Sequence, residues 1–207
     1  VLADFQPKVP ANFTDSDVVM LGNLHPIVQS SVLDQLTSKP KLVVLDTMNF
    51  WMDCALPELM DVMKRIDVIT INDEEARQLS GEYSLVKAAE VIHQMGPKYV
   101  VIKKGEHGAL LFNDDHVFFA PALPLKEVFD PTGAGDTFAG GFSGYLAQSE
   151  NISFSNMKNA IIYGSNLASF CVEKFGTERM VNLSEQEVDA RLQQFKMLTQ
   201  FDIELAD

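Results

Sequence analysis

Short apolar runs recur along the first half of the chain. They are separated by longer stretches in which the apolar residues recur with a helical period. The runs occupy 18–21, 42–45, 68–71 and 99–102. They are rich in Val, Ile and Leu, and three of them are followed directly by glycine, aspartate or asparagine. Short continuous apolar runs bounded by such residues are typical of buried β-strands.

Helical patterns fill the stretches between these runs and most of the chain after residue 133. Pro26 suits the first turn of one helix, and Gly96-Pro97 is a strong stop signal for another. Ser184 and Glu187 have the spacing of a capping box. A helix is also expected to begin with the acidic residues at 72–75. The other predicted helices cover 27–36, 56–66, 85–95, 134–148, 154–172 and 185–201.

This alternation of strands and helices predicts βαβ units, and therefore a mostly parallel sheet with helices on both faces. The segments 108–112 and 117–120 predict an antiparallel hairpin at one edge of that sheet. No repeat, low-complexity tract or linker divides the chain. We therefore expect an α/β fold with three layers, α/β/α, in a single domain spanning 1–207.

The charge balance is strongly acidic. Lys and Arg number 16 against 29 Asp and Glu, so the formal net charge is −13. Such a surface repels a phosphate backbone, and nucleic-acid binding is therefore not expected. No apolar run approaches the ~20 residues of a membrane-spanning helix, and the first residues lack a signal-peptide pattern. These features predict a cytoplasmic protein with no membrane partner.

The two cysteines, Cys54 and Cys171, each lie inside an apolar segment. We expect two buried free thiols rather than a disulfide. The four histidines are scattered without metal-ligand spacing, so a structural zinc site is not expected.

The segment 130–141 carries the most informative chemistry in the chain. Small residues at 133–135 let the backbone approach a ligand closely, and a helical pattern begins directly after them. The N–H groups at a helix start, with the helix dipole behind them, form an anion site. Asp136 lies in the first turn, where its carboxylate could accept a proton from an alcohol. The residues alone also fit a glycine-rich helix start without any chemical role.

The same run, from Asp130 to Gly141, resembles the C-terminal signature of the PfkB/ribokinase family of kinases. The resemblance implies that Asp136 is the catalytic base. It also implies an anion hole formed by the backbone amides of Gly133, Ala134 and Gly135.

The resemblance also implies roles for further positions. Asp130 and Thr132 match positions that help to bind a monovalent cation, such as K⁺, and carbonyl groups around Gly176 would complete that site. Asn166 lies in a segment similar to the helix that covers adenine in the family. From the residues alone, this small-residue helix also fits close packing against another helix.

The segment 72–75 (NDEE) resembles the N-x-x-E motif of the same family. The resemblance implies that Asn72 and Glu75 organise Mg²⁺ and its water shell near the phosphates. Mg²⁺ prefers oxygen ligands and keeps several waters, so one amide oxygen and one carboxylate suffice. An acidic cluster at a helix start is also explained by the helix dipole alone.

The segment 103–108 (KKGEHG) resembles the K/T-x-G-x-x-G turn of the family. The resemblance implies that Lys103, Gly105 and Gly108 contact the nucleotide, with the lysine acting as a point charge near a phosphate. These residues also fit a glycine-bearing turn between two strands. The two residues between the glycines are expected to face solvent.

Two more positions follow predicted strands, at the edge where ligands of open α/β sheets collect. Asn23 lies beyond the first strand and Asp46 ends the second. A role for Asp46 in the site and a purely local role both remain open. Phe50 and Trp51 are expected to pack locally rather than to bind a sugar.

The sequence lacks a P-loop motif and the motifs of protein kinases. The resemblance therefore implies a different kind of ATP-dependent kinase, which transfers the γ-phosphate to a hydroxyl group of a sugar or sugar-like small molecule. ATP and Mg²⁺ would be its cofactors. Nucleosides or pyrimidine vitamins are alternative acceptors, and nucleotide binding without turnover is an alternative function.

The resemblance covers the C-terminal part of the family's length and lacks its first strands and the small lid over the sugar. We therefore expect a ribokinase-like fold truncated at the N-terminus. Missing strands would leave a sheet edge exposed, and an exposed edge favours pairing with another chain. A homodimer is a further expectation.

Overall fold

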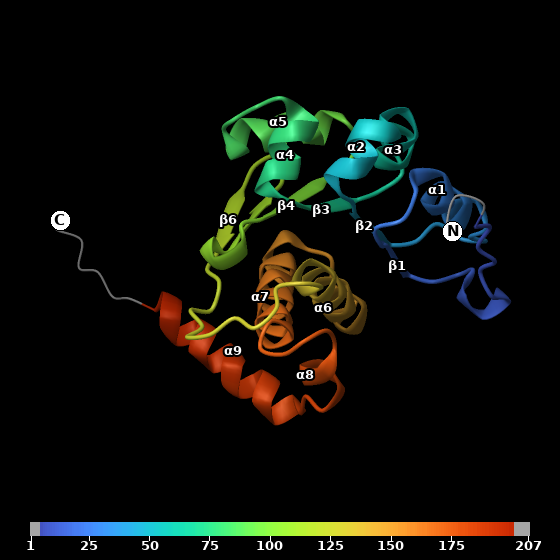
Figure 1. The fold of residues 1–207 in the computed structure, drawn as a ribbon. Helices are drawn as coiled ribbons and strands as arrows, with labels where there is room; N and C mark the ends of the chain where they lie inside the picture. The colour runs from blue at the N-terminus through green and yellow to red at the C-terminus, as the bar shows by residue number, and fades with distance from the viewer. Residues whose placement is uncertain (1–4, 201–207) are drawn as a thin grey trace.

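The computed structural model describes residues 5–200 and shows one six-stranded sheet between layers of helices (Figure 1). The strands follow the chain order across the sheet, and β1 to β4 are parallel. The last two form an antiparallel hairpin at one edge, as predicted. The strands are β1 (Val18–Leu21), β2 (Leu42–Asp46), β3 (Val68–Asn72), β4 (Tyr99–Lys103), β5 (Ala109–Phe112) and β6 (Val117–Ala120).

Helices cover both faces of the sheet, which confirms the predicted three-layer α/β/α architecture (Figure 1). One layer contains α1 (Pro26–Asp34), α2 (Asn49–Cys54), α3 (Leu56–Met63), α4 (Asp73–Ser80) and α5 (Leu85–Gln94). The other contains α6 (Ala134–Ser149) and α7 (Phe154–Cys171), with α8 (Glu178–Val181) and α9 (Glu185–Thr199) packed on the outside of α7. Two short 3-10 turns are η1 (Ala11–Phe13) and η2 (Gly105–His107).

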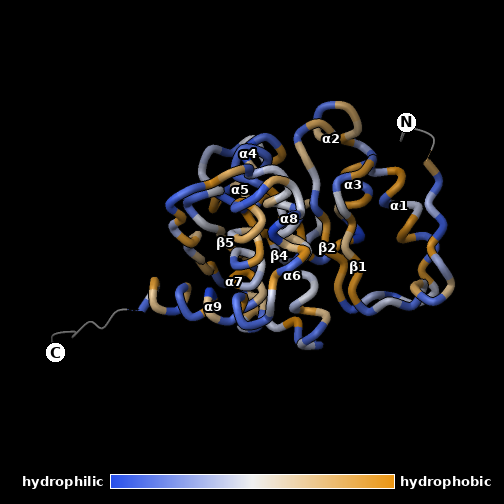
Figure 2. Tube along the Cα trace, turned by 60° about the horizontal axis from the view of Figure 1, so that its bottom comes forward, coloured by the Kyte–Doolittle hydropathy of each residue, from blue (hydrophilic) through white to orange (hydrophobic). Residues whose placement is uncertain are grey.

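The core has two halves because successive strand side chains point to opposite faces of the sheet. Val43, Leu45 and Ile69 pack toward the α1–α5 layer, while Val44 and Val68 pack toward α6 and α7. Both sets are buried, which explains why the strand sequences are continuously apolar rather than alternating. In Figure 2, β1 and β2 are drawn largely in orange, whereas α9 mixes hydrophilic and hydrophobic positions.

Two glycines let α6 and α7 pack closely together. A Cβ atom added to Gly164 would lie 2.7 Å from the carbonyl oxygen of Phe138, and one added to Gly141 would lie 2.9 Å from Leu167 Cδ1. Both contacts are too short for a side chain. Gly164 of α7 therefore serves helix packing, one of the two interpretations that the sequence allowed for this helix.

The structure corrects several details of the sequence prediction. Two short helices, α2 and α8, were not predicted, and the helix expected at 56–66 ends at Met63. Cys171 is buried as expected, but Cys54 is exposed at the last position of α2. The expectation of two buried thiols is therefore wrong for Cys54, because the end of this short helix turns the residue away from the core. The final residue of the helix predicted at 185–201 lies outside the described residues.

The sheet has two edges, β1 and β6. Val117 and Phe119 of β6 are largely exposed, at 57% and 54%. Within residues 5–200, β1 pairs with β2 alone. The expectation of a homodimer through such an edge stays a prediction. Among the helices of the described part of the chain, none has the length and apolarity needed to span a membrane.

Candidate active site at the carboxyl edge of the sheet

The face of the sheet under α6 changes from apolar to polar at the carboxyl ends of the strands. Asp46 and Thr70 are neighbours in the register of β2 and β3, and Lys103 ends β4 on the same face. This follows from the alternation of side chains along each strand. The residues two positions earlier on this face are apolar and fully buried: Val44, Val68 and Val101.

These three polar side chains form one buried hydrogen-bonded group. Asp46 Oδ1 accepts hydrogen bonds from Thr70 Oγ1 at 2.8 Å and from Lys103 Nζ at 2.7 Å. The side chains of Asp46 and Lys103 are only 8% and 17% exposed. The sequence left a role for Asp46 open, and the structure places it at the centre of this group.

The N-terminus of α6 lies directly against this group. Gly133 adopts a left-handed conformation, with φ of 81°, immediately before the first helical residue. A Cβ atom added to Gly135 would lie 3.2 Å from Lys103 Nζ, so glycine at this position lets the first turn approach the ammonium group. Asp136 is exposed in the same turn. The predicted anion site and Lys103 are thus brought together.

The backbone amides of this turn are used unequally. The N–H group of Ala134 donates to the carbonyl oxygen of Pro131 at 3.1 Å. Within the described part of the chain, the hydrogen bonds include none donated by the N–H groups of Gly135 or Asp136, and no side chain caps the helix. These two amides at the positive end of a helix are therefore available to an anion.

The loop before α6 is tied to the end of α7. The N–H groups of Phe129 and Asp130 both donate to the carbonyl oxygen of Val172. Asp130 Oδ1 accepts the N–H of Thr132 at 2.9 Å, and this hydrogen bond lowers the pKa of the Asp130 carboxyl. The conformation of the glycine-containing loop therefore depends on where α7 ends.

Cys171 joins the two segments expected to share a monovalent-cation site. Its thiol lies 3.8 Å from the carbonyl oxygen of Thr132 and 3.9 Å from that of Gly176. The structure thus brings Thr132 and Gly176 to one place, next to Gly133. The sequence gave no signal for Cys171 beyond its position near the end of a predicted helix.

Asn72 and Glu75 cap α4 reciprocally. Asn72 Oδ1 accepts the N–H of Glu75, and Glu75 Oε2 accepts the N–H of Asn72, each at 2.8 Å. Burial raises the pKa of the Glu75 carboxyl, while the hydrogen bond from Asn72 and the nearby charge of Lys103 oppose that change. The two residues of the predicted magnesium motif are therefore fixed in place, and Glu75 lies within the electrostatic reach of Lys103.

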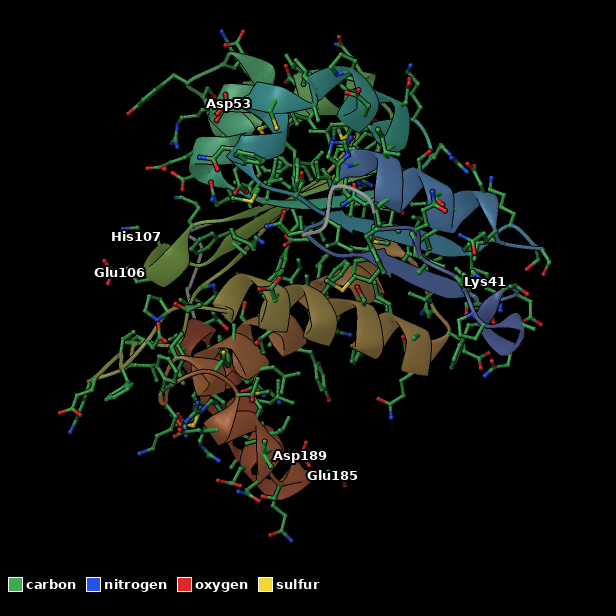
Figure 3. All side chains as sticks on the ribbon, turned by 45° about the vertical axis from the view of Figure 1, so that its right-hand side comes forward. Lys41, Asp53, Glu106, His107, Glu185 and Asp189 are labelled. Carbon is green, nitrogen blue, oxygen red and sulfur yellow. The ribbon has the colours of Figure 1, made fainter. Side chains whose placement is uncertain are left out.

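The turn after β4 explains its two glycines structurally. The N–H of Lys104 donates to the carbonyl oxygen of Gly108 at 2.8 Å, which closes the turn. Gly108 has φ of 89°, and a Cβ atom there would lie 2.0 Å from the carbonyl oxygen of Ala120. Gly105 also has a positive φ, of 55°. Glu106 and His107 project from the turn into solvent, as expected (Figure 3).

Asn166 lies inside the helix packing rather than on the surface. It is fully buried, and its Nδ2 atom donates to the carbonyl oxygen of Val188, which links α7 to α9. Its Oδ1 atom has no hydrogen-bond partner in the part of the chain that the structure describes. The structure thus gives Asn166 a packing role and leaves its predicted contact with adenine a prediction.

Aromatic residues pack together at the carboxyl ends of β1 and β2. Trp51 Nε1 donates to Asn23 Oδ1 at 2.7 Å, and the indole ring packs edge-on against His25 and Phe50. The expected local packing of Phe50 and Trp51 is present, with Phe50 still 53% exposed, and the expectation that they do not bind a sugar stays a prediction.

Comparisons with known proteins extend this picture. Residues 27–183 match the model of the pfkB family carbohydrate kinases. The cytidine kinase of Thermococcus kodakarensis is 34% identical over 143 residues, which are 66% of this chain and 50% of that protein. The ribokinase of Staphylococcus aureus is 31% identical over 137 residues, 64% of this chain and 43% of its own length. The chain thus spans half or less of the length of these curated relatives.

Solved structures show the same fold. The ribokinase of Thermotoga maritima matches 86% of this chain and 57% of its own chain, with a TM-score of 0.68 at 27% identity. The matched family region runs from α1 to beyond α8, and so it contains every residue placed above at the carboxyl edge of the sheet from Asp46 to Gly176. The polar group, the glycine loop and the capped acidic motif therefore all lie within the shared region, and the chain belongs to the pfkB family of carbohydrate kinases.

Proposed function

We propose that the protein transfers the γ-phosphoryl group of ATP to a hydroxyl group of a sugar or nucleoside. The observation that carries this proposal is the first turn of α6. There, two unpartnered backbone amides, the Lys103 ammonium group and the Asp136 carboxylate all belong to one small region. Such a combination can hold a transferred phosphoryl group and remove the proton of the attacking hydroxyl.

Each residue has a distinct role in this proposal. Asp136 is the general base, and its exposure leaves it accessible to an acceptor. The amides of the 133–135 turn and the neighbouring Asp136 N–H hold the phosphoryl oxygens. Lys103 contributes a positive charge to the nucleotide phosphates, and the 105–108 turn lies beside it.

The nucleotide side and the cation side of the proposed site lie in different segments. Asn166 belongs to the helix proposed to cover adenine. Asp130, Thr132 and the carbonyl of Gly176 are the proposed K⁺ ligands, and the position of both carbonyls around Cys171 supports this assignment.

The acidic motif fits a magnesium ion held largely through water. Glu75 is 8% exposed as a whole residue, and the raised pKa of its carboxyl reflects the cost of burying its charge. A nearby cation would favour the ionised form. Residues 5–200 contain no group of three or more His, Cys, Asp or Glu side chains arranged as metal ligands, and Mg²⁺ commonly needs only one or two carboxylates. Bound there, Mg²⁺ would neutralise charge on the phosphates, while Asn72 and Glu75 orient its water shell.

The relatives support both sugars and nucleosides as the acceptor. One is a cytidine kinase and another a ribokinase. The aminoimidazole riboside kinase of Salmonella enterica, solved with aminoimidazole riboside and an ATP analogue, shares the fold with a TM-score of 0.73 at 21% identity, over 86% of this chain and 63% of its own. Vitamin kinases of the same fold are a further alternative for the acceptor.

A second candidate function is nucleotide binding without turnover. The observation that favours it is that the free amides of α6 and the Lys103 ammonium group would serve phosphate binding equally well without transfer. A site that cannot exclude water or orient the acceptor binds its nucleotide without productive transfer.

The test is ADP release with Mg·ATP and a panel of sugars and nucleosides. Asp136→Asn should lower the rate by about 10²–10⁴, because it removes the base while keeping the shape. Asp189→Asn, at an exposed carboxylate on α9 (Figure 3), is the matched control and should leave the rate unchanged. Full activity of Asp136→Asn would contradict the assignment of the base. ATP binding without ADP release for any acceptor would support the second candidate.

A further inference from the structure

The Asp46 carboxylate has no part in the proposed transfer, yet it is one of the most constrained charges in the protein. One oxygen, Oδ1, accepts both the Thr70 hydroxyl and the Lys103 ammonium group. Asp46 and Lys103 are separated by 57 positions in the sequence and meet because β2 and β4 flank β3. Asp46 on β2, itself held by Thr70 on β3, therefore fixes the position of the Lys103 side chain.

The Lys103 ammonium group lies where a positive charge is otherwise unfavourable. It approaches the first turn of α6 to within 3.2 Å of the position that a Cβ atom of Gly135 would take. The N-terminus of a helix carries a partial positive charge, so it repels a cation placed beside it. Asp46 supplies the compensating negative charge and holds the ammonium group in this position.

Stability alone gives a weak reason for this pair. A buried ion pair is often no more stabilising than apolar residues of similar volume, and apolar residues occupy the same face two positions earlier in each strand. The pair is also incompletely satisfied. An ammonium group has three donors, and among the described residues Lys103 Nζ has one hydrogen-bond acceptor, Asp46. Two donors remain beside the unpartnered amides of α6.

We propose that Asp46 is a positioning residue, which holds Lys103 against the first turn of α6 so that the ammonium group and the helix amides form one phosphate-binding site. Asp46 acts through Lys103 and does not touch the ligand. The ligand class is the polyphosphate of a nucleoside triphosphate. This inference rests on the proposed function, because it deepens the description of the same site.

The experiment compares the binding of ATP and adenosine to the purified protein by calorimetry. Asp46→Asn keeps the shape of the side chain and an oxygen acceptor but removes the charge. ATP binding should weaken about tenfold, as expected for the loss of a hydrogen bond to a charged group. Adenosine binding should change less than about twofold, because adenosine lacks the phosphates that Lys103 would contact. General damage to the fold would weaken both ligands equally.

Asp67→Asn is the matched control. Asp67 also carries a carboxylate that joins two strands, but at the opposite edge of the sheet, where Oδ2 accepts the N–H of Val43 at 2.8 Å. This variant should leave the ratio of ATP to adenosine affinity unchanged. If Asp46→Asn does not fold, Thr70→Val provides the same test, because it removes one hydrogen bond to Asp46 and leaves the charge. A smaller but still phosphate-selective loss is expected.

A double-variant cycle shows whether Asp46 acts through Lys103. After Lys103→Met, the further substitution Asp46→Asn should have no additional effect on ATP affinity. Additive losses would overturn the inference, as would an ATP affinity that Asp46→Asn leaves unchanged. In both cases the proposed function would stand. Failure of the unsubstituted protein to bind ATP would overturn the proposed function, and this inference with it.

Discussion

Two groups of buried or partly exposed charges in the described part of the protein differ in what surrounds their cations. One is the Asp46, Thr70 and Lys103 group under α6. The other, which we call the α7–α9 cluster, surrounds Phe170 and contains Glu173, Arg179, Glu187 and Arg191.

Each charged side chain of the α7–α9 cluster is paired with an oppositely charged member of the same cluster. The two oxygens of Glu173 accept from Arg179 and Arg191, and both guanidinium groups lie over the ring of Phe170. Arg191 also donates to Ser169, and Arg179 to Glu187. Such a closed network fastens helices together. In the group under α6, Lys103 lies instead beside two helix amides that donate no hydrogen bond within residues 5–200, and this difference separates a structural cluster from a ligand site.

The largest expected effect comes from breaking the closed cluster. Arg191→Ala removes a stacked guanidinium and leaves Glu173 partly unpaired, so the free energy of unfolding should fall by about 3 kcal/mol. Urea denaturation measures this loss. The ATP affinity of the folded protein should stay the same, and a lower affinity would show that the cluster also shapes the site.

Replacing both partners of the other pair, by Lys103→Met together with Asp46→Leu, should have the opposite pattern. ATP binding should weaken about tenfold, whereas the free energy of unfolding should fall by less than about 1 kcal/mol, because apolar side chains of similar size then replace both charges and neither is left buried alone. Calorimetry and urea denaturation of the same sample provide both values. A large loss of stability with unchanged ATP affinity would show that Lys103 has a structural role like that of the charges in the α7–α9 cluster.

Gly135→Ala should change the stability of the protein and its affinity for ATP in opposite directions. Alanine stabilises a helix relative to glycine by up to ~1 kcal/mol. Its Cβ atom, however, would lie 3.2 Å from Lys103 Nζ and force the ammonium group to move by a few tenths of an ångström. ATP binding should therefore weaken about threefold while the melting temperature rises. A rise in both the ATP affinity and the melting temperature would contradict the close approach of Lys103 to α6.

The smallest effect concerns pH and Glu187. The hydrogen bonds from Ser184, and after them that from Arg179, lower the pKa of Glu187 from 4.5 to about 2. A lowered pKa means that the ionised group stabilises the folded state above pH 4.5, and that this stabilisation is lost as the pH falls toward about 2. Glu187→Gln should lower the melting temperature slightly at pH 7 but not near pH 2. An equal difference at both pH values would contradict this assignment.

The sequence predicted those parts of the fold that depend on local patterns. The four parallel strands were recognisable because each is continuously apolar; β2, β3 and β4 are buried on both faces, and β1 is partly buried at the edge of the sheet. The Ser184 capping box also depends on residues only three positions apart and was predicted. Helix α2 was missed because its six residues, Asn49–Cys54, are too few to show a helical period.

The sequence could predict which candidate residues lie together only where they belong to one segment, as in the turn from Gly133 to Asp136. The pairing of Asp46 with Lys103 was not, because it depends on the order and register of three strands. The contact of Cys171 with Thr132 and Gly176 likewise depends on where α7 ends relative to the loop before α6. Local patterns therefore selected the candidate residues, and the topology determined which of them meet.

The hydrogen bond between Trp51 and Asn23 has a practical consequence. Trp51 is the single tryptophan of the sequence, and its indole lies at the carboxyl ends of β1 and β2. Its fluorescence emission therefore originates from the same edge of the sheet as the candidate site, while the α7–α9 cluster contributes none. The protein thus carries an intrinsic optical probe, and a change in emission on adding a ligand would locate the event at this edge without any label.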